Sequence, residues 1–167
     1  EHLIKKGCRQ IAFLAMSENL AIINHRQRGY EEALRVHGLQ HNRNLIINCK
    51  NSEVDCLSLI RRKLKNKNRP DGVVGSVEKL TTAVYTVCNE LKLKMPQDVK
   101  VISFSSLQIA SLLNPSLTTI TQPAFEMGKM AAKFLFNILE KKTLGVKRET
   151  IVLPSILVER GSTQKSK

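Results

Sequence analysis

The chain has 167 residues, with 27 lysines and arginines against 14 acidic residues, which gives a net charge of +13. This length suits one domain or two small lobes, and a core of that size needs neither a disulfide nor a metal. The sequence holds no run of 18 or more apolar residues and no basic, apolar opening segment, so we expect neither a membrane-spanning helix nor a leader.

The positive charge leaves two interpretations open. An excess of cations attracts polyanions in a salt-dependent way, but it is also common on a solvated surface without a partner. The densest basic run, residues 61–69, ends an expected helix, where cations complement the helix dipole. With five phenylalanines, two tyrosines and no tryptophan, the chain lacks the aromatics of a base-stacking platform. Charge alone therefore does not predict a DNA reader.

The chain alternates short apolar runs with longer amphipathic stretches. We expect strands over residues 11–15, 45–47, 73–75, 99–104 and 117–120, then 151–153 and 156–158 as a pair or as one strand bent at Pro154. We expect helices over 23–37, after a Ser52 cap to residue 64, over 78–91 and after Pro123. The last of these is apolar on two sides, which is typical of a helix that packs between partners.

Strands that alternate with helices predict an α/β fold, a mainly parallel sheet flanked by helices. Ligands bind such sheets at the carboxyl ends of the strands. That rule nominates the residues that follow successive strands: Met16-Ser17, Ser76-Val77, Ser105-Ser106 and Thr121-Gln122.

Residues for catalysis and for cofactors are missing from this edge. The sequence contains no dinucleotide fingerprint, no phosphate-binding loop and no nucleophile elbow. The expected edge has no histidine, and its one certain acid is Glu78, so a proton-transferring pair is absent. We expect a binding protein rather than an enzyme, with no catalytic residue and no cofactor.

The cysteines and histidines do not predict a metal site. Cysteines 8, 49, 56 and 88 lie among apolar residues and form no C-x-x-C pair, so we expect four buried, reduced thiols. His37 and His41 are four residues apart, but a glycine lies between them and no acid accompanies them.

Six short motifs follow one another along nearly the whole chain. They are HLIKKGCRQIA at 2–12, RQRGYEEAL at 26–34, RPDGV at 69–73, MPQDVKVISF at 95–104, PSLTTITQP at 115–123, and LP with VERGST at 153–163. In this order they resemble motifs of the effector-binding domain of the LacI/GalR family. Each motif is weak alone, but their order over nearly the whole chain makes the resemblance specific.

The resemblance implies a periplasmic-binding-protein-like lobe of a cytoplasmic transcription regulator. Residues 1–121 would form the C-terminal effector-binding subdomain, 122–154 a return segment to an N-terminal subdomain outside this chain, and 155–167 a final strand and polar tail. The partners it implies are a small effector (a sugar, sugar acid or phosphosugar), a second copy in a homodimer, and DNA through an upstream helix-turn-helix, with no membrane.

The resemblance also implies ligand-binding residues, with departures from the family pattern. The family's effector-binding arginine falls on Arg26, although an ion pair with Glu78 is an alternative role. Val77 and Glu78 replace an Asn-Asp pair, Ser105 replaces an aspartate, and Ser76 and Gln122 complete the set. Fewer carboxylates predict an anionic or less hydroxylated effector, or a degenerate site. Gln122 either contacts ligand or satisfies hinge backbone.

The family's dimer contacts fall on an apolar cluster after Ser105. The cluster consists of Leu107, Ile109, Leu112 and Leu113, and the alternative is a loop packed over its own core. The family's other contact helix, 78–91, is expected to be core here. A different class of protein, an extracytoplasmic sugar-binding protein that feeds a transporter, has a similar fold, and only sequence upstream of Glu1 distinguishes the two.

Overall fold

The computed structural model describes residues 1–16, 21–49, 52–106, 108–141 and 150–164. The helices are α1 His2–Lys5, α2 Ala21–Val36, α3 Glu53–Leu64, α4 Glu78–Glu90 and α5 Ala124–Lys141, with short 3-10 turns η1 Arg43–Leu45 and η2 Gln108–Ser111. The strands are β1 Ile11–Ala15, β2 Ile46–Asn48, β3 Gly72–Gly75, β4 Lys100–Phe104, β5 Thr118–Thr121 and β6 Ile156–Val158.

The strands form one sheet in the order β2-β1-β3-β4-β5-β6. Strands β1 to β5 are parallel to their neighbours, with Phe13 opposite both Ile46 and Val74, and only β6 runs antiparallel, against β5. The predicted fold class, α/β with a mainly parallel sheet flanked by helices, is confirmed. The prediction of a strand at 151–153 is wrong, since those residues form no strand and pair with none in the described sheet, and Val152 is 85% exposed.

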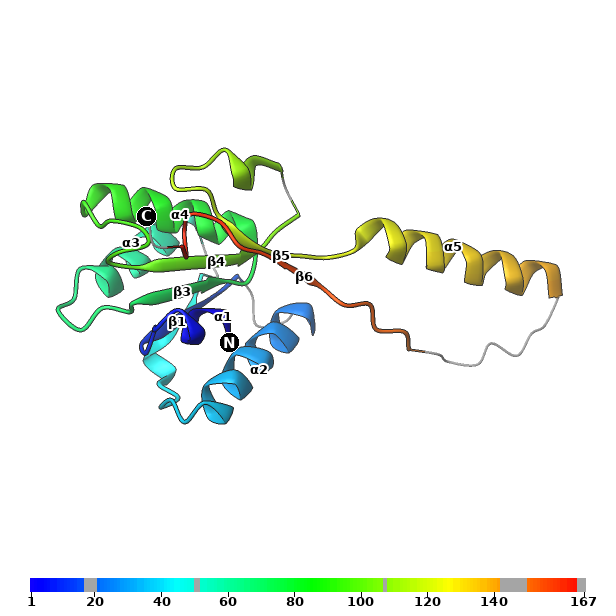
Figure 1. Ribbon diagram of the computed structural model, residues 1–167, viewed down its shortest axis with the longest axis horizontal. Coiled ribbons are helices and arrows are strands. Elements are labelled where there is room, and N and C mark those ends of the chain that lie inside the picture. Colours follow the sequence, from blue (N-terminus) through cyan, green and yellow to red (C-terminus); the bar gives the residue numbers. More distant parts are fainter. Residues whose placement is uncertain (17–20, 50–51, 107, 142–149, 165–167) are drawn as a thin grey trace.

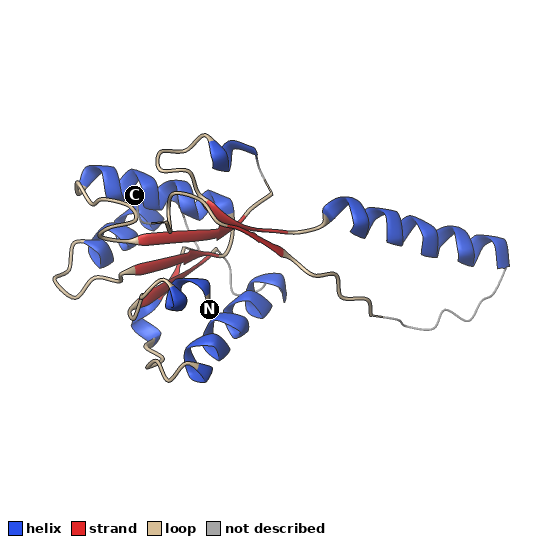
Figure 2. Ribbon diagram, viewed as in Figure 1, coloured by secondary structure: helices blue, strands red, loops and turns tan. Residues whose placement is uncertain are grey.

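Helices cover both faces of the sheet, as Figure 2 shows. Successive residues of a strand point to opposite faces, so Leu14 packs into the cluster under α3 and α4, while Phe13 packs under α1 and α2. The expected face of 78–91 is confirmed as core, because α4 buries Val84 and Val87 completely. On α3 the buried residues are Cys56, Ile60 and Leu64, whereas the apolar residue Val54 in its first turn is 71% exposed.

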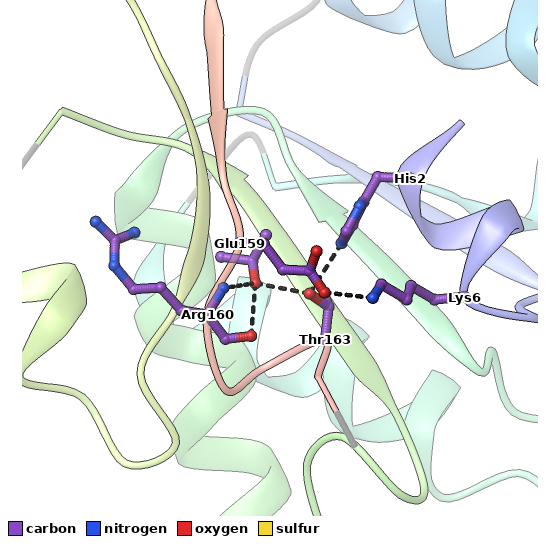
Figure 3. Close-up of polar contacts among 6 residues, drawn as sticks. His2, Lys6, Glu159, Arg160 and Thr163 are labelled. Carbon is purple, nitrogen blue, oxygen red and sulfur yellow. Dashed lines mark hydrogen bonds and ion pairs between the residues drawn. The ribbon is translucent and has the colours of Figure 1, made fainter. Parts of the chain in front are cut away.

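The segment after β6 returns into the lobe and joins α1 to β5, as Figure 3 shows. Lys6 forms an ion pair with Glu159, and the His2 ring shares a hydrogen bond of 2.9 Å with the Thr163 hydroxyl. The backbone N–H of Arg160 donates to Thr118 Oγ1 at 2.9 Å. Ser162 is fully buried and its hydroxyl donates to the Val101 carbonyl. This segment therefore fastens the carboxyl-terminal part of the chain to the sheet centre.

Residues 122–141 and 150–155 form an arm that projects away from the rest of the lobe (Figure 1). We call this segment the arm, and residues 1–121 with 156–164 the body. Helix α5 belongs to the arm, and none of its described side chains is buried. Large apolar residues such as Phe125, at 79% exposure, face solvent on it. The expected helix after Pro123 is present, but the described residues provide no second layer against it.

Candidate functional site at the carboxyl edge of the sheet

Parallel pairing brings the ends of β1, β3, β4 and β5 to one edge of the sheet. Met16, Ser76, Ser105 and Gln122 follow these strands directly, so the edge nominated from the sequence contains them together. Ser17, also nominated, lies outside the described residues. Helices α2 and α4 begin at this edge and α2 brings Arg26 to it in its second turn.

Arg26 is held in place by a backbone carbonyl and an aromatic ring. Its Nη1 donates a hydrogen bond of 2.6 Å to the carbonyl oxygen of Ser76, and its guanidinium carbon lies 4.3 Å from the centre of the Phe104 ring. Such a cation–π contact orients the planar group and leaves its edge available to a ligand. Partial burial lowers the pKa of Arg26, although a guanidinium stays charged at any physiological pH.

Arg26 does not form the ion pair with Glu78 that was its alternative role, since the contacts of both residues in the described structure lie elsewhere. Glu78 lies in the first turn of α4 and accepts a 2.8 Å hydrogen bond from the hydroxyl of Ser105 at Oε2. The serine that replaces the family's aspartate thus binds a neighbouring carboxylate. Val77 is the N-cap residue of α4 and has no side-chain cap.

Ser76 and Gln122 take different positions at the edge. Ser76 is fully buried, and its hydroxyl has no partner among the described residues. Gln122 is exposed at the start of the arm. Ser76 therefore contributes its carbonyl to the orientation of Arg26, while Gln122 presents its amide to solvent beside the edge.

A groove of about 640 Å³ runs from Arg26 along the α1–α2 face of the sheet. Val74, Ile102 and Ile120 form its apolar floor, and Gln122 lies at the same rim as Arg26. Its volume is within the range of small-molecule pockets. Phe104, which lines it beneath the guanidinium, is a site residue that the strand-end rule missed, because the rule selects residues after a strand rather than the last residue in it.

The described side chains at this edge can bind a polar molecule. Among the described residues they include the cation Arg26, the carboxylate of Glu78, serine hydroxyls and the Phe104 ring, and His25 lines the groove as well, a set that suits hydroxyl and anionic groups. No cluster of His, Cys, Asp and Glu that could hold a metal occurs among the described residues. In the same part of the chain, no helix is long and apolar enough to span a membrane.

A disulfide near this edge corrects the prediction of four reduced thiols. Cys49 directly follows β2, Cys56 lies in α3, and the two are bonded with Cα atoms 4.8 Å apart. The α3 turn folds back over the end of β2, which brings the two side chains together within the usual Cα range of a disulfide. Cys8 and Cys88 remain free and buried, as predicted.

The apolar cluster proposed for dimer contacts is divided. Ile109 and Leu112 are 57% and 81% exposed, whereas Leu113 packs against the α3–α4 core. Leu107 lies outside the described residues. Among the three described members of the cluster, the alternative of a loop packed over its own core therefore fits Leu113.

Comparison with known proteins identifies the family to which this fold belongs. Residues 1–163 match the periplasmic binding protein-like domain, and the chain belongs to that family. It has the form found in the effector-binding domains of LacI-family regulators.

The E. coli ribose operon repressor is 29% identical over 162 residues, 97% of this chain and 48% of the repressor. Catabolite control protein A of Priestia megaterium is 24% identical over 98% of this chain and 49% of its own length. The chain thus spans about half the length of the curated relatives it matches.

Solved structures of regulators show the same fold. The transcription regulator CcpA of Lactococcus lactis superposes with a TM-score of 0.82 at 26% identity, over 98% of this chain and 59% of that one. A sugar-binding LacI-family regulator from E. coli, complexed with phosphate, has a TM-score of 0.84 at 26% identity, over 96% of this chain and 56% of its own.

Proposed function

We propose that this chain is the effector-binding lobe of a LacI-type transcription regulator, and that a small polar effector binds at its carboxyl edge. The observation that supports this most strongly is the placement of Arg26, which Ser76 and Phe104 orient without engaging it in an ion pair among the described residues. A role in binding rather than in catalysis agrees with the relatives, which are named as regulators.

The effector is a sugar, a sugar acid or a phosphosugar, and the charges at the edge favour the anionic members. The guanidinium of Arg26 presents a planar set of donors that matches a carboxylate or phosphate. Ser105 and Val77 carry no charge, and the hydroxyl of Ser105 already satisfies part of Glu78. Fewer acceptors therefore face the hydroxyls of a neutral sugar. Ser76, Val77, Glu78, Ser105 and Gln122 are the proposed lining beside Arg26.

The test is a substitution of Arg26 in the full-length parent protein. A thermal-shift screen of sugars, sugar acids and phosphosugars identifies a ligand, and calorimetry measures its affinity. Arg26→Ala should weaken binding at least about tenfold, because a charge-assisted contact is lost. The matched control is Arg28→Ala, which removes an exposed arginine from the same helix. Equal affinities for the wild type and Arg26→Ala would leave Arg26 a structural residue.

We also propose that residues 122–154 are a return segment which packs on an N-terminal subdomain outside this chain. The exposed apolar side chains of α5 support this, because such a surface normally has a partner. Limited proteolysis should cut α5 quickly in the isolated chain and slowly in the full-length protein. Equal cleavage rates would contradict the proposed segment.

The parent is proposed to be a homodimer that contacts itself through Leu107, Ile109, Leu112 and Leu113. Leu112→Asp should shift the full-length protein towards monomer in light scattering, since the charge would be buried at the contact. Val54→Asp, at an exposed apolar residue of α3, is the control and should leave the dimer intact. A dimer that is insensitive to Leu112→Asp would remove this interface.

DNA recognition is assigned to a helix-turn-helix outside this chain, in a cytoplasmic protein. Effector binding would shift the balance between two lobe arrangements by its differential affinity for them. The isolated chain should bind DNA weakly and with a steep salt dependence, and sequence-specific binding at physiological salt would contradict this assignment. The named relatives are regulators, which favours this assignment over a transporter's binding protein.

A further inference from the structure

A second concave surface lies at the opposite edge of the sheet, where the parallel strands begin. It is a cleft of about 490 Å³ between the start of β1, the η1 loop and the end of α3. Five strand residues in β1 separate it from the carboxyl edge, roughly 16 Å at 3.3 Å per residue. We call it the amino-edge cleft. It shares no lining residue with the groove that starts at Arg26.

The amino-edge cleft is positively charged. Its described lining contains the cations Arg9 and Lys63 and no acidic side chain. Lys63 lies in the basic run at residues 61–69. Two arginines of that run are already paired, since Arg61 forms an ion pair with Glu90 and Arg69 forms one with Asp98. Lys63 has no such partner among the described residues, so its charge is available in the cleft.

Arg9 is also without a carboxylate partner for its side chain among the described residues. Its Nη1 donates to the carbonyl oxygens of Ile4 and Cys8, which positions the guanidinium. The nearby Asp71 carboxylate accepts the backbone N–H groups of Arg9 and Gln10, at 2.8 and 2.9 Å. A lysine at a helix end also complements the helix dipole, but Arg9 precedes a strand and has no such role.

Side-chain amides form much of the remaining wall. The loops that carry them are shaped by local hydrogen bonds, from Asn44 N–H to Asn42 Oδ1 and from Asn68 N–H to Asn66 Oδ1. The amides of Gln10, Gln40, Asn44 and Asn68 line the cleft and have no hydrogen-bond partner among the described residues. Each can both donate and accept a hydrogen bond, which is what hydroxyl groups require.

We propose that the amino-edge cleft is a second ligand site, and that it binds a phosphate monoester of a polyhydroxy compound such as a hexose phosphate. Two cations match the charge of one phosphate dianion, and charge-assisted bonds to phosphate are strong. The amides would bind the hydroxyls, and the cleft volume lies within the range of small-molecule pockets. This site is independent of the effector site proposed above, because it uses other residues at another edge.

The experiment uses the full chain with Arg26→Ala as background, so that the carboxyl edge does not contribute. Calorimetry at constant ionic strength compares glucose 6-phosphate, glucose and inorganic phosphate. Glucose 6-phosphate should bind in a saturable way, at least tenfold more tightly than either of the other probes, because only it engages both cations and amides. Hydrogen exchange should slow at residues 40–45 and 63–69 on binding.

Substitutions then distinguish binding in the cleft from a general attraction of anions to the basic surface. Lys63→Gln should weaken glucose 6-phosphate binding at least fivefold, whereas Lys65→Gln, which removes an exposed lysine next to the same helix end but outside the cleft, should change it less than twofold. Gln40→Ala, which changes no charge, should weaken glucose 6-phosphate at least threefold and leave inorganic phosphate unchanged.

Four results would overturn the proposal. They are an absence of saturable binding, equal losses from Lys63→Gln and Lys65→Gln, exchange protection confined to the carboxyl edge, and displacement of the sugar phosphate by a DNA duplex with the same dependence on Lys63. The last would make the cleft a nucleic-acid contact instead.

Discussion

The body and the arm contain similar apolar residues but bury them to very different extents. Phe13 in β1 is completely buried and stacks on Tyr30 with ring centroids 5.3 Å apart, whereas Phe136 on α5 is 61% exposed. Both lie in segments whose sequence is strongly apolar. An apolar pattern therefore predicts a helix or strand that needs a partner, but it does not predict that the same chain contains that partner.

The largest expected difference between the two regions is in unfolding free energy. Phe13→Ala should destabilise the chain by about 3 to 5 kcal/mol, because it opens a cavity in a closely packed core. Phe136→Ala should change stability by less than about 0.5 kcal/mol, because its ring has little packing to lose. Urea unfolding followed by circular dichroism measures both variants. Similar losses would mean that α5 packs against a partner in solution.

Reduction of the Cys49–Cys56 disulfide should lower the stability of the body alone, because the arm contains no cysteine. The bond closes a loop with a sequence separation of 7, and loss of such a crosslink costs about 2 kcal/mol through the entropy of the unfolded chain. Urea unfolding with and without dithiothreitol measures this. The matched control is the Cys49→Ser, Cys56→Ser double variant, whose stability should not respond to dithiothreitol.

Thiol titration checks the same bond independently. Burial raises the pKa of both Cys8 and Cys88 to about 11, so at pH 8 neither is a reactive thiolate in the folded chain. We expect almost no reaction of the native protein with Ellman's reagent, two thiols after unfolding, and four after unfolding and reduction. Four thiols in the unfolded, unreduced protein would contradict the disulfide.

The smallest expected difference in stability between body and arm comes from replacing one glycine in each region by alanine. A Cβ on Gly75 would lie 2.5 Å from Thr81 Oγ1 and 3.0 Å from Ser103 Oγ, while one on Gly128 of α5 would meet nothing within 4 Å. Gly75→Ala should therefore destabilise by at least about 1 kcal/mol through overpacking. Gly128→Ala should stabilise helix α5 by about 0.5 to 1 kcal/mol, since alanine favours a helix. Thermal unfolding of the two variants compares them, and a stabilised Gly75→Ala would show that Thr81 can move away.

Most of the body was predictable because its signals are local. The continuous apolar run at 11–15 predicts a strand covered on both faces, and the alternation of Phe13 and Leu14 between the two cores follows from it. The segment 151–153 has a similar apolar character, yet it forms no strand, because strand formation also requires a neighbour with free backbone groups.

At the candidate site, the sequence predicted the set of strand ends but not their contacts. Parallel pairing alone brings Ser76 and Ser105 to one edge. The partners of Arg26 depend on where α2 crosses that edge, so the Phe104 ring and the Ser76 carbonyl were not predictable from spacing. The amino-edge cleft was missed for the same reason, since its lining comes from loops far apart in the sequence.

The sequence by itself determined the alternation of strands and helices, and with it the parallel sheet and the edge where the strands end. These follow from periodicities of two to four residues, which depend on backbone geometry alone. Only the tertiary structure decided the Cys49–Cys56 bond, the return of residues 159–163 to α1 and β5, and the exposure of α5. Each of these depends on which distant segments come within a few ångströms of one another, and that is a property of the whole fold.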